Sequence, residues 1–123
     1  MMQVLSVSSA SDYATVVAQH EQVLAEFSQS SCTSGPCVEE ALRAINQERS
    51  LADFTLLKVR MDLLGSAFFK KLGVIEIPTL VLISRGVEVA RHTGFYNPDT
   101  IASRIEQAFW GGKSRPAIAT SFG

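Results

Sequence analysis

The two cysteines of the chain lie close together, in the stretch SSCTSGPC that covers residues 30–37. Four residues separate Cys32 from Cys37, whereas redox enzymes usually place two between such thiols. Disulfide exchange needs one thiolate to attack a disulfide and a second thiol to resolve the mixed disulfide. A four-residue turn containing Gly35 and Pro36 can bring the Cα atoms within the roughly 4.4–6.8 Å that a disulfide requires. The stretch therefore fits a working thiol pair with an enlarged loop, a pair that has lost its redox activity, or two unrelated core cysteines.

The composition is typical of one ordinary globular domain. The 123 residues are 46% hydrophobic and 19% charged, with a net charge of −1. No basic stripe indicates nucleic acid, and the longest apolar runs are about a quarter of the roughly 20 residues that span a bilayer. The N-terminus lacks a cationic start and a long apolar centre, so we expect a cytoplasmic protein without a signal peptide. In that compartment a lone cysteine pair is more often catalytic, redox-sensing or metal-binding than structural.

The elements that must position these cysteines follow from the apolar patterns. Strands are predicted at about residues 4–7, 23–27, 55–61, 79–84 and 87–90. Helices are predicted at about 34–48, 66–72 and 98–110, and a first helix, capped by Ser9 or Ser11, has its apolar stripe at 13–20. Asn97, Pro98 and Asp99 form a strong helix start. Strands alternating with helices, followed by a hairpin, predict an α/β domain with a central mixed sheet and helices on both faces. We expect this domain at residues 1–111, with a tail at 112–123 that lacks periodicity.

Four segments in this order resemble the thioredoxin fold. VLAEF at residues 23–27, followed by the cysteine loop and a helix, is similar to the family's central strand and redox site. GPC at 35–37 matches the end of the family's Trp-Cys-Gly-Pro-Cys motif, and LLKVRMD at 56–62 looks like its third strand. IPTLVLISRG at 77–86 closely resembles the family's cis-proline segment and hairpin. The resemblance covers about residues 4–110 and implies a single-domain thioredoxin fold.

The resemblance gives two different alignments of the cysteine loop. Counting forward from Phe27, Cys32 occupies the position of the nucleophile. Counting back from the helix, Cys37 matches the resolving cysteine and Ser34 falls where the nucleophile should be. Ser34 is also a good N-cap residue, and both arrangements can hold if Cys32 folds back over the helix tip. We expect Cys32 to be the nucleophile, and Ser34 remains the alternative.

Other site residues also follow from the resemblance. The resemblance places Glu26 at the position of the family's buried acid, which passes a proton to the resolving cysteine, and places Lys58 next to it. The alternative is a glutamate at the edge of the sheet that points to water. A substrate peptide is expected to pair as an extra strand beside Ile77, next to a cis peptide bond at Pro78 and to Gly94. The resemblance also assigns Gly35 and Pro36 to the substrate-binding surface.

These residues predict a thiol–disulfide oxidoreductase that acts on protein disulfides with a thiol reductant system and needs no cofactor or metal. Ser28 and Ser31 stand where the family has tryptophans, so a weaker or more specialised enzyme than a general reductase is expected. One alternative is a redox-inactive adaptor that binds peptides through the cis-proline groove. Another is a metal or cluster carrier across a dimer. No nucleic acid or membrane partner is expected, and the protein is expected to be a monomer or a weak dimer.

Overall fold

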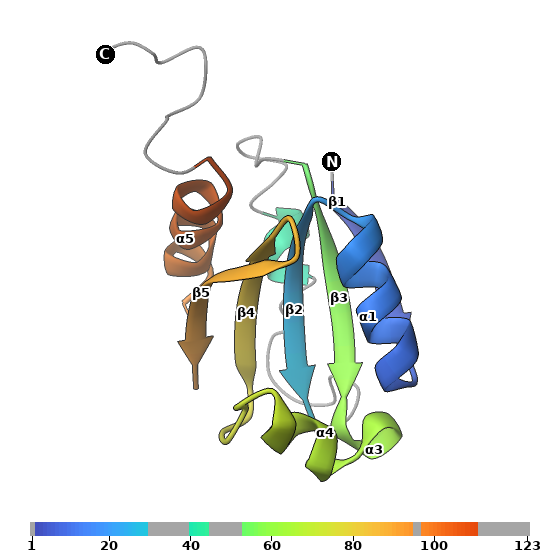
Figure 1. Ribbon diagram of the computed structural model, residues 1–123. Coiled ribbons are helices and arrows are strands. Elements are labelled where there is room, and N and C mark those ends of the chain that lie inside the picture. Colours follow the sequence, from blue (N-terminus) through green and yellow to red (C-terminus); the bar gives the residue numbers. More distant parts are fainter. Residues whose placement is uncertain (1, 30–39, 45–52, 95–96, 111–123) are drawn as a thin grey trace, which may run out of the picture.

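The computed structural model describes residues 2–29, 40–44, 53–94 and 97–110. Within them, five strands form one sheet in the order β1-β3-β2-β4-β5. β1 and β2 run parallel to β3, whereas β4 is antiparallel to both β2 and β5 (Figure 1). This mixed sheet confirms the predicted architecture and makes β2 the central strand. The strands are β1 (Met2–Val7), β2 (Gln22–Ser28), β3 (Phe54–Arg60), β4 (Thr79–Ser84) and β5 (Val87–Thr93).

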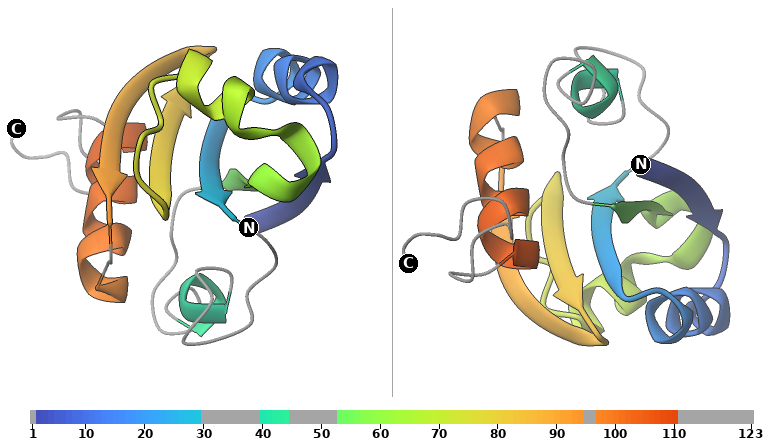
Figure 2. Two further views of the ribbon diagram at one scale, coloured as in Figure 1. Left: turned by 90° about the horizontal axis from the view of Figure 1, so that it is seen from below. Right: turned by 90° about the horizontal axis from the view of Figure 1, so that it is seen from above.

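Helices cover both faces of the sheet (Figure 2). One face packs against α1 (Ala10–Gln19), α3 (Met61–Leu64) and α4 (Ser66–Lys71). The other packs against α5 (Pro98–Trp110) and the helical residues 40–44, from which Leu42 is fully buried. Side chains of β2 alternate between the two hydrophobic cores. Both faces of this strand are therefore buried, as expected for the central strand of a sheet with helices on both faces.

Local signals account for several element boundaries. The Ser9 hydroxyl accepts a hydrogen bond from the backbone N–H of Asp12 at 3.1 Å and caps α1. The Asn97 side chain accepts one from the N–H of Asp99 at 2.9 Å, which confirms the predicted start of α5. The predicted hairpin is also present, with positive φ angles of 54° at Arg85 and 81° at Gly86.

Some of the predicted boundaries were wrong. Residue 61 begins the short helix α3 instead of ending a strand, because the N–H of Asp62 donates to the carbonyl of Gln29 and turns the chain away from the sheet. β5 continues to Thr93, three residues beyond the predicted end, because residues 91–93 pair with 79–81 of β4. Of the helix predicted at 34–48, only residues 40–44 are described, and the tail at 112–123 lies outside the described residues.

Arg91 ties β5 to the end of α4. Its guanidinium donates to the carbonyls of Gly73 at 2.8 Å and Leu72 at 3.1 Å, and it forms two hydrogen bonds with the Glu88 carboxylate. The hydrogen bond from Arg91 lowers the pKa of Glu88. Tyr13 of α1 packs against Phe68 of α4. Its pKa is raised mainly by burial and also by the nearby negative charge of Glu88. These contacts hold the segment between α4 and β4 against the sheet.

Replacing Arg91 by methionine is therefore expected to lower the free energy of unfolding at pH 7 by about 1–2 kcal/mol, because two carbonyls and a carboxylate lose their donor. The folded-state pKa of Glu88 is depressed, so its share of this stability is present above the usual value of 4.5 and is lost as the pH falls through the lower folded value. Denaturant unfolding at pH 7 and at acidic pH measures both effects. The difference in the free energy of unfolding between the parent protein and the Arg91→Met variant should be smaller at acidic pH.

Arg85→Met is the matched control. Arg85 pairs with Glu21, but both side chains are largely exposed, at 79% and 61%. An exposed pair of this kind contributes about 0–1 kcal/mol, so this variant should stay close to the parent protein. Equal losses in the two variants would show that Arg91 acts only as a surface charge.

Candidate active site

The candidate site lies at the end of the sheet where β2 finishes. β2 ends at Ser28, and the neighbouring β4 begins at Thr79, because the two strands are antiparallel. β5 ends at the same edge, where Thr93 pairs with Thr79 (Figure 1). The cysteine segment continues the chain just beyond Gln29 at this edge. Cys32, Gly35, Pro36 and Cys37 lie outside the described residues, so their predicted roles stay predictions.

Pro78 and Gly94 lie side by side at this edge. The peptide bond between Ile77 and Pro78 is cis. The N–H of Gly94 donates to the carbonyl of Pro78 at 2.8 Å, and Gly94 has a φ of 91°, which favours glycine. The Thr79 hydroxyl donates to the carbonyl of Glu76, which closes the turn before β4. Two sequence-predicted residues that are far apart in the chain are thus brought together, and Ile77 lies half-buried next to them.

Glu26 and Lys58 are register partners on β2 and β3. Register partners on parallel strands project to the same face, which here is the face covered by residues 40–44 and α5. Glu26 is 6% exposed on the central strand, so the alternative of a Glu at the sheet edge is wrong. The same transverse row continues to Leu80 on β4 and His92 on β5. An acidic and a basic residue are therefore paired across β2 and β3, two residues before the end of β2 at Ser28.

Two charged features of this edge escaped the sequence analysis. Arg60 is the register partner of Ser28 and forms a two-pronged ion pair with Asp62, at 2.6 Å and 3.0 Å. Glu76 places a side-chain oxygen near Gly94, 3.5 Å from the point that a Cβ would occupy there. The position of Glu76 two residues before Pro78 was visible in the sequence, but its closeness to Gly94 depends on the pairing of β4 with β5.

Over residues 2–29, 40–44, 53–94 and 97–110, no three His, Cys, Asp or Glu side chains gather in a way that could hold a metal ion. Within the same ranges, every helix is too short or too polar to cross a membrane.

Comparison with solved structures places this geometry among thioredoxins. A mutant thioredoxin from Halobacterium salinarum aligns with a TM-score of 0.67 and 26% identity, covering 86% of this chain and 90% of that one. Thioredoxin from Schistosoma mansoni aligns with a TM-score of 0.69 and 20% identity, covering 87% and 99%. Thioredoxin O2 from Arabidopsis thaliana gives 0.68 and 22%, covering 87% and 95%. At these lower identities the likeness shows the fold alone.

Among curated proteins, no sequence matches the chain significantly. The thioredoxin family profile, however, matches residues 3–107, which run from β1 into α5 and take in the whole candidate site. The chain belongs to the thioredoxin family.

Proposed function

We propose that this protein is a thiol–disulfide oxidoreductase that acts on protein disulfides through Cys32 and Cys37. The observation that carries the proposal is the assembly of two separate groups of residues around the end of β2. Pro78 and Gly94 lie on one side, and the buried Glu26 with Lys58 lies beneath. The cysteine segment leaves the sheet at this same point. Family membership supports the reaction class, and the sequence supplies two cysteines with four residues between them.

The proposed reaction conserves atoms and electrons in two steps. The Cys32 thiolate attacks one sulfur of the substrate disulfide, forming a Cys32–substrate bond and releasing the other substrate sulfur as a thiolate. The Cys37 thiolate then attacks the Cys32 sulfur, forms the Cys32–Cys37 disulfide and releases the second substrate thiolate. The substrate gains two electrons and the protein dithiol loses two. A dithiol reductant returns the protein to its starting state by the same exchange.

Glu26 is proposed to take the proton from Cys37 before the second step. A thiol with the usual pKa of about 8.5 is only a few per cent thiolate at pH 7, so removal of this proton limits the attack. The carboxyl group of Glu26 lies in a nearly dry environment on the central strand, with Lys58 as its register partner. A buried carboxyl group with a basic residue beside it can accept a proton and return it.

The substrate is proposed to bind as an extended peptide beside Ile77, Pro78 and Gly94. The carbonyl of Pro78 is already bonded to Gly94, which leaves the backbone of Ile77 as the pairing edge. Ser28 and Ser31 stand where the family has aromatic residues, so these two positions offer a substrate less apolar surface. Recognition then depends more on the residues near Pro78, which favours a specialised enzyme.

Incubating the reduced protein with a small disulfide-bonded protein and a dithiol reductant tests the proposal. Reduction of the substrate should exceed the rate of the reductant alone. Alkylation and mass spectrometry of the oxidised protein should find Cys32 and Cys37 joined to each other. If both thiols remain open to alkylation and no substrate is reduced, the oxidoreductase proposal fails and a binding role for the groove takes its place.

A further inference from the structure

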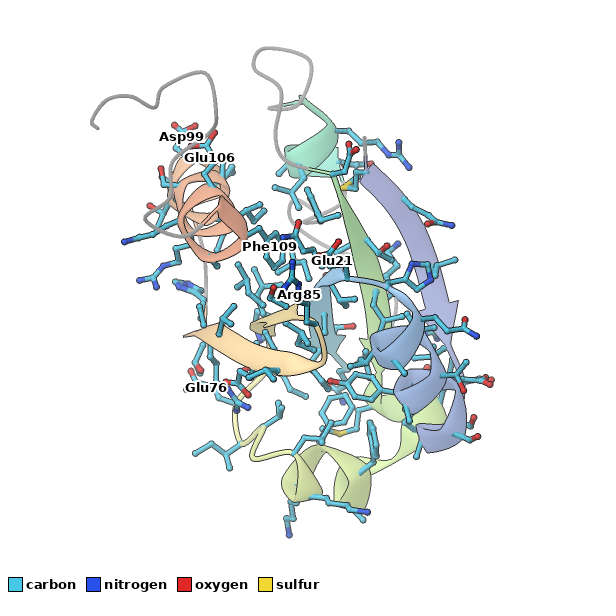
Figure 3. The ribbon with its side chains drawn as sticks, turned by 45° about the horizontal axis from the view of Figure 1, so that its top comes forward. Glu21, Glu76, Arg85, Asp99, Glu106 and Phe109 are labelled. Carbon is cyan, nitrogen blue, oxygen red and sulfur yellow. The ribbon has the colours of Figure 1, made fainter. Side chains whose placement is uncertain are left out.

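Hydrogen bonds to backbone carbonyls hold the turn that carries Glu76, next to the proposed peptide-binding residues Pro78 and Gly94. The carbonyl of Glu76 accepts the Thr79 hydroxyl, and the following turn is closed by the bond between Gly94 and Pro78. Its carboxylate oxygen lies 3.5 Å from the Cβ position of Gly94. A negative charge therefore stands beside the surface along which the substrate backbone is proposed to run. Figure 3 shows Glu76 well apart from the Glu21–Arg85 pair.

Glu76 has no ion pair with any residue that the structure describes. Glu21, Asp62 and Glu88 each pair with an arginine. The charge of Glu76 is thus available to a group brought by a ligand.

Ile75, which precedes Glu76 in the chain, adds an exposed apolar side chain to this segment. Its side chain is 91% exposed, which is the largest exposure among the big hydrophobic residues described. Lysine and arginine combine an aliphatic stem with a cationic end, and they lie along such apolar surfaces while the charge reaches a carboxylate. An acidic side chain in the same place would meet repulsion from Glu76.

We infer that Glu76 makes the groove selective for disulfides flanked by lysine or arginine. This inference rests on the proposed exchange function and names its substrate class. An exposed ion pair is worth about 0.2–1 kcal/mol, or about 1.4- to 5-fold, and the repulsion of an acidic peptide adds a similar factor. We therefore expect a kcat/KM ratio of about three to ten between a basic and an acidic peptide disulfide.

Two synthetic peptide disulfides that differ only in having lysine or glutamate beside the cysteine provide the test. In the full-length protein, Glu76→Gln should lower the lysine-to-glutamate ratio of kcat/KM at least twofold, and Glu76→Lys should reverse the preference. Glu21→Gln removes one exposed charge elsewhere and should leave the ratio unchanged. At 1 M salt, where the screening length is about 3 Å, the ratio in the unmodified protein should fall toward one.

A second arm separates this inference from the exchange function. The same peptides with cysteine replaced by serine are titrated against each protein, and their dissociation constants are compared. Equal exchange of both peptides, or a preference that survives Glu76→Gln and Glu76→Lys, overturns the inference while the exchange function stands. If neither peptide is reduced, the exchange function fails, and the binding ratios decide alone whether Glu76 selects basic peptides.

Discussion

Replacing Cys32 by serine is expected to lower disulfide exchange by about 10³-fold or more, to the rate of the reductant alone. A hydroxyl does not ionise near neutral pH, so the variant lacks the group that attacks the substrate. Cys37→Ser should behave differently, because the first attack remains possible and only the resolving step is lost. Mass spectrometry under non-reducing conditions should then find substrate covalently joined to Cys32.

Ser34→Ala is the matched control for this pair. It removes the hydroxyl from the residue that one alignment places at the nucleophile position, and it leaves both thiols intact. Exchange should be retained, with a loss of about 1 kcal/mol of stability if Ser34 caps the following helix. If Cys37→Ser abolishes the first attack and Cys32→Ser does not, the proposed roles of the two cysteines are reversed.

Much of the fold could be predicted because the decisive signals are local. The apolar run that contains Glu26 predicted a buried strand, and Asn97 with Pro98 predicted the start of α5. The missed features depend on distant partners. α3 begins where Asp62 meets the carbonyl of Gln29, and the last residues of β5 are polar side chains on an edge strand, whose extended form depends on pairing with β4.

For the candidate site, too, the sequence identified individual residues, whereas their spatial relations depend on strand pairing. Spacing alone identified the cysteine pair, and the resemblance supplied Glu26, Lys58, Pro78 and Gly94 as candidates. Only the parallel register shows that Glu26 and Lys58 share one face. The placement of Glu76 beside Gly94 joins residues 18 apart in sequence through the closure of the β4–β5 hairpin, and no sequence period signals such a contact.

The second large effect is expected at Glu26. Glu26→Gln keeps the size of the side chain and one oxygen acceptor, but the amide cannot take a proton at neutral pH. The resolving step should slow by about 10²-fold, which is the contribution of a positioned general base. Formation of the mixed disulfide should be unchanged, because that step uses the Cys32 thiolate. Rapid mixing under single-turnover conditions separates the two steps.

Measuring the free energy of unfolding of Glu26→Gln checks that the slower resolving step comes from the lost proton acceptor and not from a damaged fold. A neutral amide is less costly to bury than a carboxylate, but Lys58 loses the charge opposite it, so the free energy of unfolding should fall by no more than about 3 kcal/mol and the protein should stay folded. Thr55→Val is the control: Thr55 is also a buried polar residue, 4% exposed, and its hydroxyl lies 3.3 Å from Nδ1 of His20. Thr55 is on β3 and projects to the opposite face from Lys58, so its loss should cost about 1 kcal/mol and leave both steps intact. If Glu26→Gln slowed both steps equally, or Thr55→Val slowed the resolving step as much, Glu26 would be a structural residue, because only a proton acceptor acts on the second step alone.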